Sequence, residues 1–333
     1  MTKIFACGFI VLDILATDLS YLPKPGEAVI ASNGIKFWIG GHPANMSVDL
    51  MQMGLEEGDV RVALAVGKDL QGDFCENFLR ARNVKGQLQR VENAQTGISL
   101  VLVKKGEDKA VTITLGANLS LDYNYVISSL KDTKPKILYV ASGILGDFDF
   151  RLAELLEFCQ KNHIHTIVDL ANPYQKEWNY SHPALPYINV LHSNVKELRG
   201  ITGKIESIDG LRWLSNKGVK LPIVSDGKFG AIAFFKGKFI KQPAFNVNAV
   251  DPTGAGDAMC AGTAKKLLEA IECGKALEDL NIQEVTELLL FAQAAGAACV
   301  GEIGTTAGVR IERINQILKE QGEKVLSQTV VTQ

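Results

Sequence analysis

Val250-Asp251-Pro252-Thr253-Gly254-Ala255-Gly256-Asp257-Ala258 is the stretch that decides the fold. It follows a strand-like run at 238–247 and precedes an apolar-periodic segment at 258–271 that predicts a helix. The stretch is therefore a loop that leads into a helix N-terminus, where free backbone N–H groups and the helix dipole favour an anion. Small residues in this loop allow the backbone to approach a phosphate closely; they are Gly254, Ala255 and Gly256.

Asp257 is the residue in this loop that an anion site alone does not explain. A carboxylate beside a bound phosphate repels it, unless the carboxylate takes the proton of a substrate hydroxyl as that hydroxyl attacks phosphorus. The alternative is that Asp257 is a helix N-cap after an ordinary glycine turn. Two glycines and one aspartate on their own favour the N-cap, because short motifs often match by chance.

The composition bounds the class of protein. A chain of 333 residues with 47% hydrophobic content can bury a large core, as one large α/β domain or as two smaller ones. The net charge of -2 argues against nucleic acid or an acidic membrane surface as the main partner. We expect a cytoplasmic protein, because the N-terminus lacks a secretory pattern and the longest apolar stretch, 288–300, is too short to span a bilayer.

From Ile137 onward, short apolar runs alternate with segments of helical periodicity. This order predicts a mostly parallel sheet with helices on both faces, and such sheets bind ligands at the carboxyl ends of their strands. We expect strands at 137–140, 166–169, 189–192 and 222–225, and helices at 150–160, 194–201 and 207–216.

Other β-rich runs predict a small separate sheet. The runs 97–103 and 110–114 flank a charged turn at 104–109 and are typical of a hairpin. The run 28–32 also has the composition of a strand.

Gly40-Gly41-His42-Pro43-Ala44-Asn45 opens a further predicted helix, in which Pro43 suits the first turn. A double glycine before a helix offers backbone N–H groups to the hydroxyls of a small polar ligand, or it is plain capping.

Both motifs resemble signatures of the ribokinase-like, or PfkB, carbohydrate kinases. The first, G-G-x-x-A-N, matches 40–45, and the second, D-T-T-G-A-G-D, matches 251–257 with Pro252 where Thr is common. The resemblance runs in family order from Gly8 to about Thr306. It implies a single ribokinase-like α/β domain at 1–323, lid strands drawn from about 9–36 and 94–118, and a loose tail at 324–333.

The resemblance implies an ATP-dependent kinase that transfers the γ-phosphoryl group to a hydroxyl of a small sugar, as ribokinases and fructokinases do. Asp257 would be the base, and the N–H groups of Gly254, Ala255 and Gly256 would stabilise the transferred group. Thr96 and Asn118 would lie near the edges of the sugar. The positions that match the family's sugar contacts are Asp13, Gly40, Gly41 and Asn45.

On the nucleotide side, Asn194 and Glu197 share a helix face, which fits a capping box or a pair that holds the waters of Mg²⁺. The family's N-x-x-E motif implies the Mg²⁺ role, and both can hold at once. The segment 225–230 resembles the family's G-x-x-G turn, or is a plain hairpin. The resemblance implies nucleotide contacts at Asn194, Ser225, Gly227, Gly230 and Gln293, and a monovalent cation such as K⁺ at Asp251 and Gly304.

Two alternatives remain beside the sugar kinase: a nucleoside kinase with the same signatures, and a sugar-binding protein that has lost turnover. The sequence does not identify the sugar. His42-Pro43 is more typical of fructokinases and related kinases than of ribokinases, and Tyr174 stands where many members carry Arg. Since the lid of this family often supports dimers, the resemblance also allows a homodimer. A G-x-x-x-x-G-K-[ST] sequence is absent, which argues against a P-loop kinase.

Overall fold

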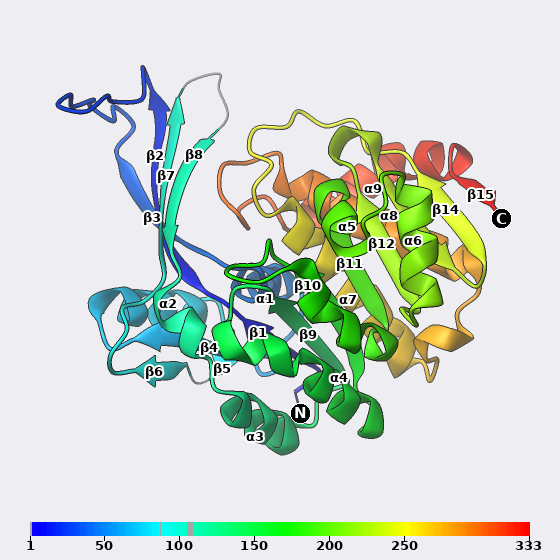
Figure 1. Cartoon of the computed structure of the whole chain (residues 1–333). Helices are drawn as coiled ribbons and strands as arrows, with labels where there is room; N and C mark the ends of the chain where they lie inside the picture. The colour runs from blue at the N-terminus through cyan, green and yellow to red at the C-terminus, as the bar shows by residue number, and fades with distance from the viewer. Residues whose placement is uncertain (1, 87, 105–108) are drawn as a thin grey trace.

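The fold is built on one large sheet (Figure 1). The computed structural model describes residues 2–86, 88–104 and 109–333. The strands of the sheet are β1 (Ile4–Gly8), β4 (Val60–Gly67), β5 (Lys85–Gly86), β6 (Gln89–Val91), β9 (Ile137–Ser142), β10 (His165–Leu170), β11 (Val190–Asn194), β12 (Leu221–Ser225), β13 (Ala231–Phe235), β14 (Lys238–Gln242) and β15 (Val330–Thr332).

The strand order is β15-β14-β13-β12-β11-β10-β9-β1-β4-β5, with β6 beside β4. Pairing is parallel from β12 to β5 along this order and antiparallel from β12 to β15. The central strands are nearly continuous apolar runs and are buried, as expected of parallel strands that are covered on both faces. The predicted mostly parallel sheet is confirmed.

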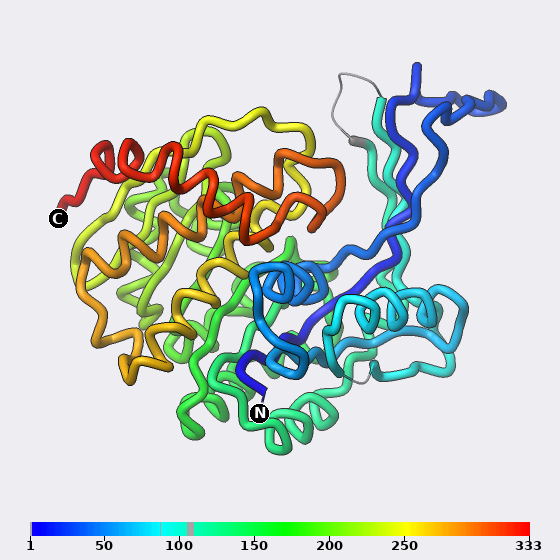
Figure 2. The backbone as a smooth tube through the Cα atoms, turned by 180° about the vertical axis from the view of Figure 1, so that it is seen from behind, coloured from blue at the N-terminus to red at the C-terminus, as the bar shows by residue number. Residues whose placement is uncertain are grey.

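Helices cover both faces of this sheet (Figures 1 and 2). Helices α1, α7, α8 and α9 pack against one another on the face turned forward in Figure 2, and α4, α5 and α6 lie on the opposite face. The helices are α1 (His42–Gln52), α2 (Leu70–Arg80), α3 (Tyr123–Thr133), α4 (Leu152–Lys161), α5 (Val195–Thr202), α6 (Ser207–Asn216), α7 (Ala255–Glu272), α8 (Ile282–Cys299) and α9 (Ile311–Ser327).

A second sheet projects from this body (Figure 1), and its order is β3-β2-β7-β8. Strands β2 and β7 are parallel, and the two outer pairs are antiparallel. The predicted hairpin is confirmed on both sides of its turn, while residues 105–108 of that turn lie outside the described residues. The strands are β2 (Val11–Leu19), β3 (Ile35–Gly40), β7 (Ile98–Lys104) and β8 (Lys109–Thr114).

The prediction of a strand at 28–32 is wrong. That segment has no strand pairing, and β3 at Ile35–Gly40 takes its place in the lid. The difference lies in packing, because the segment around Ile30 is exposed, whereas Ile39 is buried and the ring of Trp38 packs edge-on against Phe78 of α2 at 5.0 Å. Strand composition without a surface to pack on did not make a strand.

The base of the lid is held by buried polar groups. Asn118 accepts a hydrogen bond from Ile10 N at 2.9 Å and donates to Ile10 O at 2.8 Å, which braces the start of β2. Thr96, before β7, donates to Asp69 through its N–H at 2.7 Å and its hydroxyl at 2.6 Å. Both residues therefore support the lid where it leaves the body.

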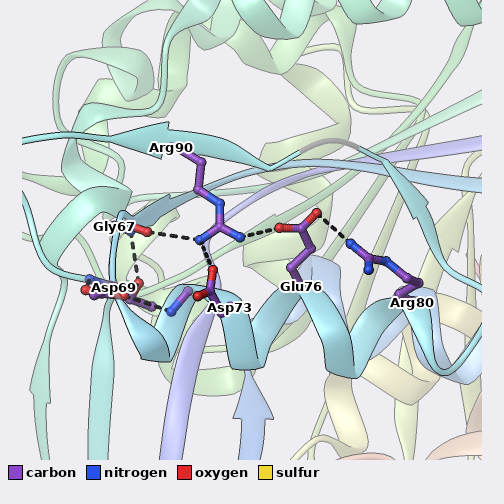
Figure 3. Close-up of polar contacts among 8 residues, drawn as sticks. Gly67, Asp69, Asp73, Glu76, Arg80 and Arg90 are labelled. Carbon is purple, nitrogen blue, oxygen red and sulfur yellow. Dashed lines mark hydrogen bonds and ion pairs between the residues drawn. The ribbon is translucent and has the colours of Figure 1, made fainter.

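Arg90 ties the same region together (Figure 3). Its guanidinium donates to Gly67 O at 3.3 Å, forms an ion pair with Asp73 at 2.9 Å, and contacts Glu76, which also pairs with Arg80. These contacts join β6 to the end of β4 and to α2. The lid thus leaves the body next to a network of ion pairs and hydrogen bonds.

The prediction of a loose tail at 324–333 is wrong. Helix α9 continues to Ser327, and β15 pairs antiparallel with β14, with Ile240 opposite Val331. The Thr329 hydroxyl accepts a hydrogen bond from Gln242 Nε2 at 3.2 Å. Three β-branched residues at 330–332 suit an edge strand, and β14 offers them an open edge.

In the described ranges 2–86, 88–104 and 109–333, the helices are each too short or too polar to cross a lipid bilayer.

A buried ion pair orders the loop after β9. Asp149 lies in a short 3₁₀ turn at Gly146–Arg151 and is fully buried, and Lys176 Nζ approaches its Oδ2 at 2.7 Å with a side chain only 6% exposed. Asp149 also accepts hydrogen bonds from the Ser142 hydroxyl at 2.6 Å and from two backbone N–H groups, those of Gly143 and Leu145, at 2.8 Å. The pair therefore shapes the carboxyl edge of the sheet, where ligands bind.

We expect Lys176→Met to lower the free energy of unfolding by about 3–5 kcal/mol, because it leaves the buried Asp149 carboxylate without its counter-charge. Lys161→Met is the matched control, since it breaks an exposed pair with Glu157 and should cost less than about 1 kcal/mol. Urea unfolding of the three proteins measures both changes. Equal losses in the two variants would contradict the role given to Lys176.

Candidate active site

Asp257 lies in the first turn of α7 and is only 6% exposed. The N-cap of the helix is Gly254, with φ 86°, and a Cβ added to this glycine would lie 2.2 Å from Thr305 O. The N-cap interpretation of Asp257 is therefore wrong. The first helical hydrogen bond runs from Ala258 N to Gly254 O at 2.9 Å, so the N–H groups of residues 255–257 precede the regular helical bonding.

Asn45 holds the side chain of Asp257. Its Nδ2 donates to Asp257 Oδ2 at 2.8 Å, and its Oδ1 lies 3.0 Å from the hydroxyl of Thr305. The Thr305 hydroxyl is also 3.2 Å from Ile39 O, at the end of β3. One amide thus links α1, α7 and the segment after α8, and it orients the carboxylate.

Two histidines and a second aspartate lie beside Asp257. His42 Nδ1 is 3.3 Å from Asp169 Oδ2 and 3.8 Å from Asp257 Oδ1. His192 Nδ1 is 3.7 Å from Asp169 Oδ2, and a Cβ on Gly256 would lie 3.3 Å from the His192 ring. They come from the start of α1, from the carboxyl end of β10 and from the middle of β11, so the fold gathers them near one edge of the sheet.

Burial and mutual charge set the pKa values of this cluster. Burial lowers the pKa of His42, but the carboxylates of Asp257 and Asp169 raise it to about 10, so its ring is cationic at neutral pH. Burial raises the pKa of Asp169, and the two histidines bring it below its usual range. The pKa of Asp257 is raised, because burial outweighs the lowering effects of His42 and of the bond from Asn45. A carboxylate with a raised pKa is a stronger base.

No role for His192 follows from the sequence, in which His42 is only a hint about the substrate. A signal was present, since Asp169 and His192 both lie near the ends of predicted parallel strands, where ligands bind. The long sequence distance between them hid the contact.

The predicted sugar contacts lie around the base of the lid. Asp13 of β2 pairs with Trp38 across the lid, and a Cβ on Gly40 would lie 2.5 Å from Asp13 Oδ2. Gly41 has φ 103° and is the N-cap of α1, and a Cβ there would lie 2.3 Å from Phe9 O. Gly40 thus leaves room for the Asp13 carboxylate, Gly41 allows close backbone packing, and the two glycines lead directly to His42.

Asn194 and Glu197 form the predicted capping box. Glu197 N donates to Asn194 Oδ1 at 2.9 Å, and Asn194 N donates to Glu197 Oε2 at 2.8 Å. Burial and the nearby Asp169 raise the pKa of Glu197, which places this carboxyl within electrostatic reach of the cluster. The capping box is confirmed, and the Mg²⁺ role stays a prediction.

The segment 225–230 is a turn between the antiparallel strands β12 and β13, as the hairpin interpretation predicts. Gly230 has φ 96°, and a Cβ there would lie 2.1 Å from Gln242 O, while Gly227 has φ 50°. The Ser225 hydroxyl lies 3.1 Å from His192 Nε2, which ties this turn to the cluster.

The other predicted site residues, Gln293, Asp251 and Gly304, form hydrogen bonds within the protein. Gln293 is buried, and its Nε2 donates to Gln242 Oε1 at 2.7 Å, which joins α8 to β14. Asp251 accepts hydrogen bonds from Thr253 N at 2.9 Å and from Gly304 N at 3.1 Å. The structure therefore brings Asp251 and Gly304 together, and their cation remains a prediction.

This fold is shared with known kinases. The chain matches a ribokinase from Giardia lamblia with a TM-score of 0.83 at 20% identity, covering 95% of this chain and 99% of that one. It matches a ribokinase from Arabidopsis thaliana, whose structure is complexed with ribose and ATP, with a TM-score of 0.77 at 23% identity, covering 96% and 99%. These likenesses establish a ribokinase-like α/β fold.

Sequence comparison adds the family. The profile described as pfkB family carbohydrate kinase matches residues 1–312. A deoxyribokinase from Salmonella typhi is 27% identical over 256 residues, which cover 73% of this chain and 79% of that protein. The chain belongs to the pfkB family of carbohydrate kinases, and the family resemblance seen in its two motifs is confirmed.

Asp49 is a buried acid with no motif around it in the sequence. It lies on α1, one turn after Asn45, and it is fully buried. Within the described part of the chain, neither of its carboxyl oxygens has a hydrogen-bond partner. Burial raises the pKa of Asp49 well above its usual range, and the charge of Asp257 raises it further. The ionised form of Asp49 therefore opposes folding.

Asp49→Asn should raise the free energy of unfolding near pH 8 by on the order of 1–3 kcal/mol, because it removes an unpaired buried acid. Since the folded pKa lies above the unfolded one, the folded protein binds the extra proton between them, and wild-type stability falls as pH rises through that window. The difference in the free energy of unfolding between the variant and the wild type should therefore be smaller at pH 5 than at pH 8. Urea unfolding at both pH values measures it, with the exposed Asp132→Asn as the control; a gap that ignores pH would contradict the prediction.

Proposed function

We propose that this chain transfers the γ-phosphoryl group of ATP to a hydroxyl of a small sugar, with Asp257 as the general base. The observation that carries the proposal is the position of this carboxylate. It is buried in the first turn of α7, it is oriented by Asn45 at 2.8 Å, and it adjoins a helix N-terminus that favours phosphate.

In the proposed reaction the acceptor hydroxyl gives its proton to Asp257 as its oxygen attacks the γ-phosphorus, and the bond from the γ-phosphorus to the β,γ-bridging oxygen breaks, so that ADP leaves. The raised pKa of Asp257 makes it a better proton acceptor than an exposed aspartate. The N–H groups of Gly254, Ala255 and Gly256 stabilise the charge on the transferred group, an effect worth about 10²–10³ in rate per donor at oxyanion holes.

On the acceptor side, Asp13, Gly40, Gly41 and Asn45 orient the sugar so that the attacking oxygen lies in line with the phosphoryl group. Asp13 suits this role because it stands on a lid strand and packs on Gly40, next to the start of α1. Asn45 acts at least in part through Asp257. The family and the named activities of the relatives support a sugar as the acceptor.

On the donor side, bound Mg²⁺ would supply positive charge that bridges the phosphates. Asn194 and Glu197 would hold its waters, because the capping box engages only one carboxyl oxygen of Glu197 in hydrogen bonding. Contacts to ATP are proposed at Ser225, Gly227, Gly230 and Gln293, and a monovalent cation such as K⁺ at Asp251 and Gly304.

A homodimer through the lid is part of the proposal. Three apolar side chains on the lid, those of Ile35, Phe37 and Leu100, are 60%, 55% and 46% exposed. The pairing of Ile14 with both Phe37 and Leu100 places the last two on the same face of the sheet. Such a face suits burial against a second lid.

The acceptor class is tested by ADP release with ATP and a panel of pentoses, hexoses, keto-deoxy acids, inositols and nucleosides. We expect turnover with a free sugar or sugar acid. Turnover with nucleosides alone would replace the proposal by a nucleoside kinase, and tight sugar binding without ADP release would replace it by a binding protein.

With the best acceptor, Asp257→Asn should lower kcat by at least about 10²-fold and leave ATP affinity near that of the wild type, because only the proton acceptor is lost. Asp209→Asn, a change at an exposed carboxylate on α6, is the control and should keep full activity. Steady-state kinetics and ATP titration measure the two quantities. If Asp257→Asn kept its turnover, the base assignment would be wrong.

A further inference from the structure

The proposed base depends on histidine rings for its counter-charge. Among residues 2–86, 88–104 and 109–333, the ion-pair partners of Asp257 and of its neighbour Asp169 are His42 and His192 rather than any lysine or arginine. Asp257 is only 6% exposed, so water does little to stabilise its negative charge. The ionised form of this carboxyl therefore needs a cation close by.

Other titratable groups act on this carboxyl or on the charges beside it, and burial raises the pKa of each. They are Asp49 of α1, Tyr139 of β9, Glu197 of α5, Cys260 of α7 and Cys299 of α8. The phenol and the two thiols stay neutral near neutral pH, because burial disfavours their charged forms. The acids, together with Asp169, oppose the ionisation of Asp257 wherever they are charged. The two histidines are the charged groups that favour it.

Of the two rings, that of His42 faces the base directly. Its Nδ1 lies 3.8 Å from Asp257 Oδ1 and 3.3 Å from Asp169 Oδ2. His192 instead lies between Asp169, 3.7 Å from its Nδ1, and the Ser225 hydroxyl, 3.1 Å from its Nε2. The His42 ring therefore bridges the two carboxylates, and the His192 ring supports Asp169 from the other side.

The surroundings of His42 fix the place of its ring. It follows Gly41, whose φ of 103° and close approach to Phe9 O set the start of α1. The Phe9 ring packs against the imidazole with the two centroids 4.9 Å apart. Asp169, on the neighbouring strand β10, holds the Nδ1 side. The positive charge is thus in place before any ligand binds, which is the arrangement that makes an electrostatic effect strong.

The two carboxyl oxygens of Asp257 have different neighbours. Oδ2 accepts the hydrogen bond from Asn45 at 2.8 Å. Oδ1 lies 3.8 Å from His42 Nδ1, which is beyond the roughly 2.7–3.2 Å of an N–H···O hydrogen bond. The ring therefore acts on Oδ1 through its charge and does not occupy a lone pair of that oxygen. Oδ1 is left able to accept a proton.

We propose that His42 is a positioning residue for phosphoryl transfer: its charged ring, anchored by Asp169, keeps Asp257 ionised and leaves Oδ1 as the oxygen that takes the proton. The inference rests on the proposed function. As the acceptor oxygen bonds to the γ-phosphorus, its O–H electron pair stays on that oxygen and the proton passes to Oδ1, while ADP leaves with the electrons of the broken bond. Without the cation, Asp257 would hold a proton at neutral pH and could not accept another.

The test is the pH profile of kcat with the best acceptor. Loss of a nearby positive charge raises the pKa of an acid, so His42→Gln should move the acid limb of the profile to higher pH by at least about 1 unit. Its kcat should fall at least about 10-fold on the acid side and return to within about 3-fold of the wild type above both limbs. His42→Lys keeps a positive charge and should move the limb back toward the wild type. His163→Asn, at an exposed turn, is the matched control and should keep the wild-type profile.

A loss of kcat in His42→Gln that is the same at every pH would indicate a purely structural role and overturn the inference. An acid limb that coincides with that of the wild type, or a His42→Lys variant that behaves like His42→Gln, would overturn it as well. The His42 side chain is 28% exposed, so its replacement does not leave a closed cavity in the core. Circular dichroism confirms that each variant is folded.

A second measurement does not need turnover. The protein is labelled with ¹³C at its aspartate carboxyl groups and titrated by NMR without substrate, and the Asp257 signal is assigned by its loss in Asp257→Asn. This signal should titrate at higher pH in His42→Gln than in the wild type. That shift in a protein that releases no ADP with any acceptor would sink the proposed function and leave the pairing of His42 with Asp257 standing. Equal midpoints in an active kinase would do the reverse.

Discussion

The hydrogen bond from Asn45 to Asp257 is the contact on which the site depends. It joins residues 212 positions apart and fixes α1 against α7 at their N-terminal ends. Both helices begin at glycines whose positive φ angles and close backbone contacts exclude a side chain, Gly41 and Gly254. Since Thr305 holds the other end of the Asn45 amide, the carboxylate has one orientation. A helix N-terminus and a base are thereby set side by side.

Burial makes the neighbourhood of that carboxylate a charge-balanced cluster. Burying two aspartates without counter-charges would cost folding free energy. Two histidines from other elements of the fold reduce that cost. With a proton on the His42 ring, this arrangement keeps Asp169 ionised and holds the pKa of Asp257 below the value that burial alone would give.

Some residues of the site could be predicted from the sequence and others could not. The anion-binding loop before α7 was predicted from glycine placement, and the capping box of Asn194 and Glu197 from spacing, because both are local properties. The N-cap interpretation of Asp257 and the loose tail were wrong for one reason. Each depends on partners distant in sequence, namely the close approach of Thr305 to Gly254 and the open edge of β14.

The sequence by itself determined the alternation of strands and helices, the two glycine loops and the family, since periodicity and short-range backbone geometry are encoded locally. Only the tertiary structure decided which polar groups meet. His42, Asp169 and His192 come together because parallel strands end at one edge of the sheet and α1 begins there. Contacts of that kind arise from packing, and packing joins residues that no local pattern connects.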